Sequence, residues 1–425
     1  MKVRILVIIK REDGFFIKVV KALEYLEKLQ EEGYSKHNLK PEHWTEMLKK
    51  PNTETIEKVV SKQKGFLDDS RIAQMKEQLM QYYDELAKTK LPTKYETHLN
   101  YHIISGLSTE IESAIPTITY RDYETGEKKS LKILNPNFTK PLFGTLPMGK
   151  INATSHGGFE NNEYLITFEW ELFQFCNLLS KIVAYAMPFR QEFDGVVFLT
   201  DEETIRQRIQ DEPMITKRFR ELIVAYLIKG RVTAAPQYHI DSPYDKFASI
   251  FTHAMELFTM GHEYAHILLG HLENQDTKKK HLTPQDVYNI LFSWDQELEA
   301  DSLGLPLMLS AMGAGQKYDH SALHYCGAEL FFSGYEILER AKCIVKQGND
   351  DWYWRGGKED GAIGDHPPAE RRRNNLRELM TKNYGKDSVK TSSSVEWIIK
   401  NLWEQTKPRL VQGYKNHMNS QSKQE

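Results

Sequence analysis

The feature that most constrains the fold is one long apolar pattern, which predicts a single buried helix. The stretch YDKFASIFTHAMELFTMGHEYAHILLGH follows Pro243, and its apolar residues recur every three or four positions. Gly270 predicts where the helix stops, because glycine readily adopts the left-handed conformation in which many helices end. We therefore expect a buried helix between Pro243 and Gly270.

Two histidines in this helix are placed to bind one metal ion together. His262 and His266 are four residues apart, so they lie on the same face, one turn apart. Glu263 lies about 100° round from His262, where a base that activates water beside a metal should lie. Gly261 would let another element approach the helix backbone closely. The simplest alternative is an ordinary buried helix that happens to contain these residues.

Two histidines do not complete a catalytic zinc site, which needs three protein ligands and an open fourth position. The metzincin pattern places a third histidine six residues after His266, but that position is Leu272. The other option is a glutamate from a following helix.

The stretch DQELEADSLG supplies that glutamate. Glu297 and Asp301 are four apart on one face of a helix that we expect to begin at Thr283-Pro284. We expect Glu297 to bind the metal and Asp301 to accept a hydrogen bond from the far ring nitrogen of a ligating histidine. Glu299 is a rival ligand, but it points about 200° away from Glu297.

The combination of HExxH with ExxxD, 31 residues from His266 to Glu297, resembles the gluzincin zinc peptidases. ELEADSLG is similar to the prenyl-protease-like and heat-shock-protease-like branch. GDHPPAERRR and INATSHGGFENNEYLITFEWEL resemble that branch's His-Pro and Asn-Ala/Gly-Gly segments. Soluble bacterial peptidases of the phage-exclusion type carry a similar HExxH pattern. Unlike the branch, this chain shows no membrane span and has roughly 90 residues between the predicted strand and His262.

The resemblance implies a zinc-dependent endopeptidase acting on a protein or peptide substrate. Zn²⁺ would be bound by His262, His266 and Glu297, with Glu263 as the general base.

The resemblance also implies roles outside the zinc helices. His366, with Arg372, would stabilise the oxyanion or the bound carbonyl, although His-Pro-Pro is also a common structural turn. The strand with Tyr164, Ile166 and Phe168 would be an edge strand that pairs with the substrate backbone.

Several alternatives stay open at this point. A gluzincin-like domain can also serve as a regulatory or binding module, with residues 190–245 as a lid. A purely structural metal site is disfavoured, because such sites are closed by four ligands, usually rich in cysteine. Tyr325 or Tyr335 could donate to an oxyanion, and the sequence selects neither. Three other histidines are interpreted as surface or packing residues: His253, His271 and His281.

The chain as a whole predicts an α+β fold, mostly helical, with a small antiparallel sheet. We expect a helical N-terminal lobe over residues 1–90, a zincin-like domain over 91–410 and a disordered tail over 411–425. Within the lobe, Ile5–Ile9 predicts a strand and residues 14–90 predict helices. A hairpin is expected around Thr125-Gly126, and strands are expected at Tyr164–Phe168 and at 195–200.

The composition bears on the partners and the cellular compartment that we expect for this protein. A net charge of -3 gives no reason to expect nucleic acid or an anionic membrane as a partner. Three widely spaced cysteines indicate a reducing compartment rather than a disulfide framework. No stretch approaches the roughly 18 apolar residues of a membrane span, so we expect a cytoplasmic protein. The oligomeric state is not determined by the sequence.

Overall fold

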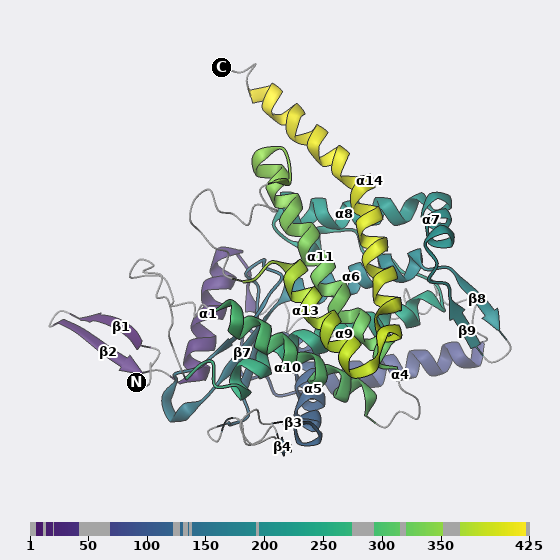
Figure 1. Ribbon diagram of the computed structural model, residues 1–425. Helices are drawn as coiled ribbons and strands as arrows, with labels where there is room; N and C mark the ends of the chain where they lie inside the picture. The colour runs from purple at the N-terminus through teal and green to yellow at the C-terminus, as the bar shows by residue number, and fades with distance from the viewer. Residues whose placement is uncertain are drawn as a thin grey trace.

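The computed structural model describes residues 6–11, 14–19, 21–41, 69–121, 128–130, 135, 138–192, 195–273, 293–314, 320–351 and 366–421. The described chain is mostly helical with small sheets, so the expected α+β class is confirmed. In Figure 1, long helices gather beside a small sheet that contains β7.

A three-stranded sheet forms one side of the fold. Its strands are β5 (Leu142–Leu146), β6 (Ala153–His156) and β7 (Leu165–Glu169), in the order β5-β7-β6. β7 pairs parallel with β5 and antiparallel with β6. The sheet is therefore mixed rather than wholly antiparallel, because the chain reverses direction twice between β5 and β7.

The strand predicted at Tyr164–Phe168 is present as β7, but its expected role as an edge strand is wrong. Both of its backbone edges are already paired, by β5 and by β6. The side chains of Tyr164, Ile166 and Phe168 are 3%, 0% and 0% exposed and belong to the main core. Among the described strands, β6 is the edge of this sheet that contacts the helix carrying His262 and His266.

Helix α9 (Tyr244–Leu268) confirms the predicted buried helix. All residues from Ala254 to Leu268 are buried, so the second half of the helix is covered on every side. Its neighbours are α5 (His98–Ala114), α6 (Trp170–Ala186), α10 (Trp294–Gly313), α11 (Ser321–Gln347) and strand β6.

Glycines set how closely these helices approach α9. A Cβ atom on Gly261 would lie 2.8 Å from the carbonyl oxygen of Gly304 in α10. A Cβ atom on Gly304 would lie 2.8 Å from the backbone nitrogen of His262. The expectation that Gly261 permits a close approach is confirmed, and the approach occurs beside the first histidine.

Buried ion pairs hold helix α13 (Ala369–Tyr384) against α11 and α14 (Lys390–Gln421). Arg377 donates to Glu329 Oε1 at 2.8 Å and to Glu396 Oε2 at 2.6 Å. Arg373 pairs with Glu336 at 2.9 Å. This network fixes α13, whose first turn faces α10.

We expected helices from residue 14 onwards, but the N-terminal segment is not helical throughout. Strand β1 (Leu6–Arg11) confirms the predicted first strand, and Gly14–Val19 forms its partner β2. The aromatic and β-branched residues of FFIKV favour a strand once a partner is available. Helix α1 (Ala22–Lys36) follows, and α4 (Asp69–Lys88) lies further along the chain.

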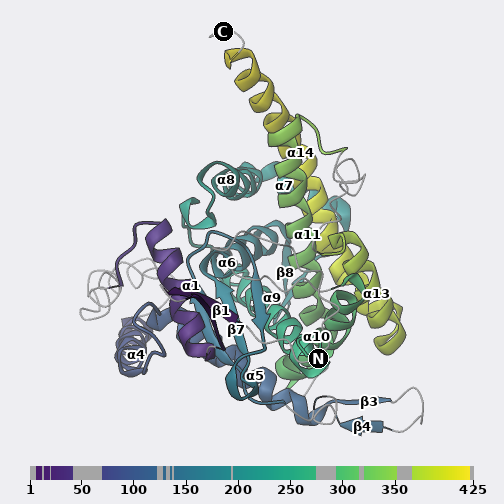
Figure 2. The ribbon, with the colours of Figure 1, turned by 90° about the vertical axis from the view of Figure 1, so that its left-hand side faces the viewer.

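Helix α1 packs on the sheet, as Figure 2 shows, although it belongs to the predicted N-terminal lobe. The Leu26 side chain fills the space over Gly144 of β5. A Cβ atom on Gly144 would clash with this side chain. The Gln30 amide donates to the Thr145 carbonyl oxygen at 3.0 Å. Helix α1 and the sheet therefore share one small core.

Other predicted elements agree with the structure in part. Strands β3 (Thr119–Arg121) and β4 (Lys128–Ser130) form the predicted hairpin, whose turn lies outside the described residues. The predicted strand at 195–200 is β9, which pairs with β8. The segment 190–245 contains β8 (Phe189–Glu192), β9 (Gly195–Phe198), α7 (Glu202–Asp211), α8 (Pro213–Lys229) and the short 3-10 helix η4 (Val232–Ala234). Three more 3-10 helices are η1 (Ile115–Thr117), η3 (Glu160–Asn162) and η6 (Lys386–Val389).

The C-terminal helix extends further than expected. Helix α14 runs to Gln421, so the disordered tail expected from residue 411 is wrong for residues 411–421. Leu410 and Val411 pack partly against the core and carry the helix past the predicted boundary. No helix in the described parts of the chain is long and apolar enough to cross a membrane.

Candidate metal centre

The two histidines of α9 face each other across a short gap. Their Nε2 atoms are 3.1 Å apart, and both rings are almost fully buried. The helical spacing of four residues places one ring above the other, as expected for two ligands of one ion.

Helix α10 brings Glu297 to this pair. The helix begins at Trp294 with Ser293 as N-cap, and the reciprocal hydrogen bonds between Ser293 and Gln296 form a capping box. The expected start at Thr283-Pro284 lies outside the described residues. Because the capping box fixes the first turn, Glu297 enters the core in a defined register. Its Oε2 atom is 3.5 Å from His262 Nε2, and its Oε1 atom is 3.7 Å from His266 Nε2.

These three side chains fit a divalent cation. One ligand atom from each lies within 4.8 Å of the others, and all three residues are buried. Both oxygens of Glu297 are inaccessible to solvent, and Oε2 also lies 2.9 Å from His366 Nδ1 and 3.4 Å from Arg372 Nη2. Burying an ionised carboxylate is costly, and a cation between it and the two imidazoles would offset part of that cost. Two histidines and a glutamate are a donor set typical of catalytic zinc.

Asp301 lies where the sequence predicts, one turn after Glu297. Its Oδ1 atom accepts from His262 Nδ1 at 2.9 Å, which leaves Nε2 facing the cavity. Arg372 in turn donates to both carboxylate oxygens, from Nε at 2.7 Å and from Nη2 at 2.6 Å. Arg372 is therefore tied to Asp301 and also lies 3.4 Å from Glu297. This arrangement orients His262 and differs from the direct oxyanion contact that the resemblance implies.

Charge interactions shift the pKa values of these groups strongly. Burial alone would lower the pKa of His262, but its contacts with Asp301 and Glu297 raise it to about 10. Burial would raise the pKa of Glu297, but His262 and His366 hold it well below its usual range. Arg372 likewise lowers the pKa of the buried Asp301. Glu297 and Asp301 therefore stay ionised beside His262 and Arg372.

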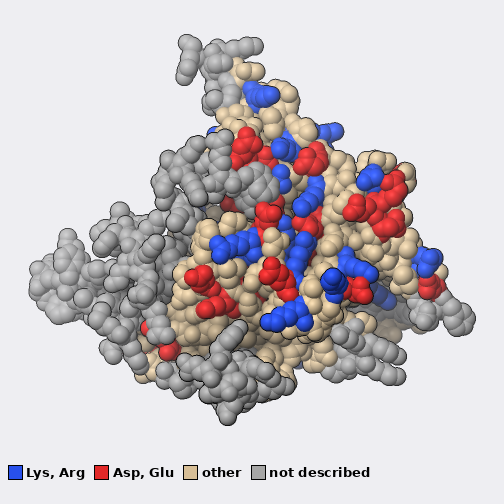
Figure 3. All heavy atoms as spheres, in the orientation of Figure 1, with Lys and Arg blue, Asp and Glu red and all other residues tan. Residues whose placement is uncertain are grey.

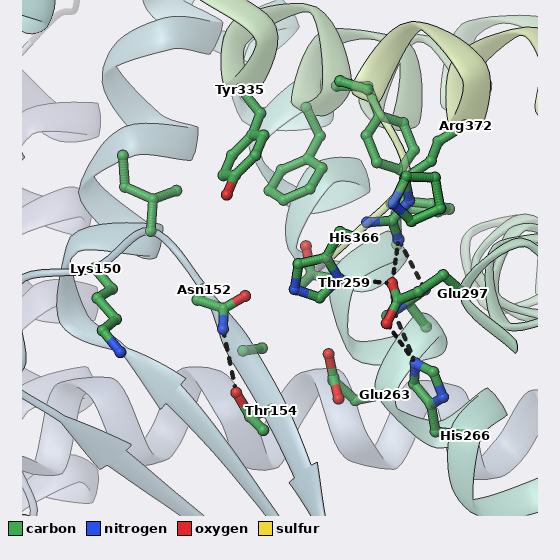
Figure 4. A pocket seen from close by; sticks show the side chains of 18 residues that line it. Lys150, Asn152, Thr154, Thr259, Glu263, His266, Glu297, Tyr335, His366 and Arg372 are labelled. Atoms are coloured by element: carbon green, nitrogen blue, oxygen red, sulfur yellow. Dashed lines mark hydrogen bonds and ion pairs between the residues drawn. The ribbon is translucent and has the colours of Figure 1, made fainter. Parts of the chain in front are cut away.

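Glu263 occupies the position expected of a base. It is 5% exposed and lines the same pocket as the three candidate ligands. In Figure 4 its carboxylate points into this pocket. Burial raises the pKa of Glu263 and the neighbouring Glu297 raises it further, against the opposing effect of His262. A raised pKa suits a carboxylate that must take up a proton near neutral pH.

His366 also reaches the centre. Its Nδ1 atom is 2.9 Å from Oε2 of Glu297, and 44% of its side chain is exposed. It comes from the short segment before α13 and lines the mouth of the pocket. The structure thus places His366 against the third candidate ligand, with its other edge open towards solvent.

The opposite wall of the pocket comes from the sheet side and from α11. Tyr164, Ile166 and Phe168 do not line it; residues 150–154, which lead into β6, do. Of the two tyrosines that the sequence left open, only Tyr335 lines the pocket, and its hydroxyl points into it (Figure 4). Tyr325 is buried elsewhere and donates to Glu329.

Sequence reasoning missed one neighbour of the centre. His271, interpreted as a surface or packing residue, has its Nδ1 atom 2.9 Å from His266 Nδ1, and Glu299 is its next partner. The signal lay in the sequence HEYAHILLGH itself, where a glycine before the last histidine allows the chain to turn back. Of the other two, His253 pairs with Glu110 at 3.0 Å and His281 lies outside the described residues.

None of the described residues that line the pocket belongs to segment 190–245, so the expected lid is not over the centre. On the face in Figure 3, Lys and Arg are interspersed with Asp and Glu rather than gathered into one basic patch. In comparisons with protein families, curated proteins and solved structures, nothing matches this chain, so the resemblance to gluzincins stays a prediction.

Proposed function

We propose that this protein is a zinc-dependent endopeptidase. The observation that carries the proposal is the buried carboxylate of Glu297, whose two oxygens lie 3.5 Å and 3.7 Å from the Nε2 atoms of His262 and His266. A cation at this point satisfies all three groups. Glu263, buried directly beside them, has no place in a purely structural metal site.

When bound, zinc would polarise the substrate carbonyl and make water acidic enough to attack near neutral pH. His262, His266 and Glu297 would hold the ion. Glu263 takes a proton from the attacking water and returns it to the amine nitrogen that leaves. Its raised pKa keeps the protonated form accessible for the second of these steps.

Other side chains support the reaction without holding the ion. The Tyr335 hydroxyl points into the pocket and would donate to the carbonyl oxygen as negative charge develops on it. Asp301 and Arg372 keep the His262 ring in the tautomer that leaves Nε2 free.

The substrate would lie extended along β6. Among the strands that the structure describes, β6 pairs with β7 alone, and residues 150–154 line the pocket. An unpaired edge offers backbone groups at regular spacing to a peptide of any sequence. This proposal moves the substrate strand from β7 to β6.

We further propose that the protein works in a reducing compartment such as the cytoplasm. The support is that Cys176, Cys326 and Cys343 are free and buried. The alternative of a regulatory module with a self-occupied cleft finds no support in segment 190–245, because that segment does not line the pocket.

The test is metal content by elemental analysis, followed by cleavage of labelled denatured casein. We expect about one zinc per chain in the wild type and in Glu299→Ala, but far less in Glu297→Ala. Glu263→Gln should keep its zinc and lose cleavage. A wild-type protein that holds no zinc, even after zinc is added, would end the proposal. A zinc-loaded Glu263→Gln protein that cleaves at the wild-type rate would rule out the assigned base.

A further inference from the structure

The two candidate histidine ligands have different outer partners. Behind His262 lie Asp301 and Arg372, an ion pair that is almost fully buried. Behind His266 lies a second imidazole, His271, which is 6% exposed. Beyond it lies Glu299, whose side chain is 63% exposed.

The turn after α9 brings His271 back to the helix. Gly270 adopts a positive φ of 68°, a left-handed conformation that residues with a Cβ atom rarely adopt. The His271 backbone nitrogen then donates to the His266 carbonyl oxygen at 3.0 Å. This turn puts the Nδ1 atoms of the two rings 2.9 Å apart.

The hydrogen positions follow from the chemistry of the centre. His266 presents Nε2 to Glu297 and His262, so this nitrogen must keep its lone pair for an ion. The proton of the neutral ring is then on Nδ1 and is donated to His271 Nδ1. His271 consequently carries its own proton on Nε2, 3.1 Å from Glu299 Oε2.

We infer that His271 is a positioning residue that fixes the tautomer and orientation of His266, with Glu299 as its outer acceptor. The inference rests on the proposed metal centre. It assigns a role to His271, the last histidine of HEYAHILLGH, and to Glu299, which is not a candidate metal ligand. His271 acts as a hydrogen-bond acceptor and does not bind the ion.

Substitution at His271 separates this role from simple packing. Asparagine places Oδ1 where histidine has Nδ1, the same number of bonds from the backbone, so His271→Asn keeps the acceptor. His271→Leu has a similar size and removes it. Losing an outer partner typically weakens metal binding about 10–100-fold. Glu299→Ala should have a smaller effect, because the carboxylate is exposed and its interaction is screened.

The experiment measures zinc affinity by chelator competition. It also records proton NMR of the Co²⁺-loaded protein in H2O and D2O, where exchangeable ring N–H protons of the ligands are resolved. We expect two such signals in the wild type. His271→Leu should bind zinc about 10–100-fold more weakly and lose one signal to solvent exchange. His271→Asn should recover both properties. His253→Leu, on the same helix but paired with Glu110, is the matched control and should resemble the wild type.

The inference is overturned if His271→Leu binds zinc as tightly as the wild type and keeps both signals. It is also overturned if the Asn and Leu variants are weakened equally, since that result indicates packing alone. Failure of the wild type to bind zinc or Co²⁺ would overturn the proposed function as well. Tight wild-type binding with unaffected His271 variants would leave the proposed function standing.

Discussion

Replacing Gly304 by alanine tests whether the close crossing of α9 and α10 builds the metal centre. A Cβ atom at this position would lie 2.8 Å from the His262 nitrogen and 3.0 Å from its Cα atom. Ordinary contacts begin near 3.4 Å, so the two backbones must separate by about 0.6 Å. Both neighbours are backbone atoms and cannot rotate away.

Two effects of the alanine oppose each other in the free energy of unfolding. Overpacking costs about 1–3 kcal/mol, whereas alanine inside a helix is about 0.5–1 kcal/mol better than glycine. We expect Gly304→Ala to lose up to about 2 kcal/mol of stability. Zinc affinity should suffer more, because ligand distances must hold within about 0.2 Å and Glu297 moves with α10.

The assay pairs urea unfolding of the metal-free protein with zinc affinity from chelator competition. Gly313→Ala is the matched control, since it lies at the end of the same helix and its Cβ atom would meet nothing within 4 Å. It should leave zinc affinity unchanged and stability equal or slightly higher. If Gly304→Ala matches the wild type in both measurements, the helix crossing does not set the ligand geometry.

Four further predictions concern protonation and catalysis. Because metal-free His262 has a raised pKa of about 10, zinc must displace its proton in order to bind. Zinc affinity should therefore rise about tenfold per pH unit between about pH 7 and 9. A zinc affinity that does not change over this pH range would contradict the prediction. The same proton stabilises the metal-free fold fully below about pH 6.5, and we expect that stabilisation to fade as the pH rises towards 10 in urea titrations. Burial raises the pKa of Glu256 to about 8, so its ionisation destabilises the fold progressively as the pH rises from about 4.5. At pH 9 the free energy of unfolding of Glu256→Gln, measured with urea, should therefore exceed that of the wild type by a few kcal/mol. At pH 5 the two proteins should be equally stable. Tyr335→Phe should lower kcat about 10²-fold with unchanged zinc affinity, and an unaltered kcat would remove the hydroxyl from the mechanism.

The candidate ligands could be predicted because they obey local periodicity. His262 and His266 share a face in any helix that contains both, and the same holds for Glu297 and Asp301. The unbroken apolar pattern around the histidines requires that helix to be buried. The structure agrees on all four positions.

The three-stranded sheet shows that a local sequence pattern can predict a strand but not the position of that strand in the sheet. The apolar run before α6 predicts a strand, and the strand forms. Whether it lies at the edge or in the centre depends on where β5 and β6 pair, and their partners are distant in sequence. The local pattern therefore predicts β7 as an edge strand, although it is paired on both sides.

The sequence by itself determined the buried helix, the two histidines with their adjacent glutamate, and the carboxylate pair that follows, since each is a property of one helix. Only the tertiary structure decided which tyrosine faces the pocket, that Arg372 contacts Asp301, and that His271 lies against His266. The physical reason is that these contacts depend on how helices cross. Two glycines, Gly261 and Gly304, allow α9 and α10 to touch along their backbones, and that crossing carries the carboxylates to the histidines.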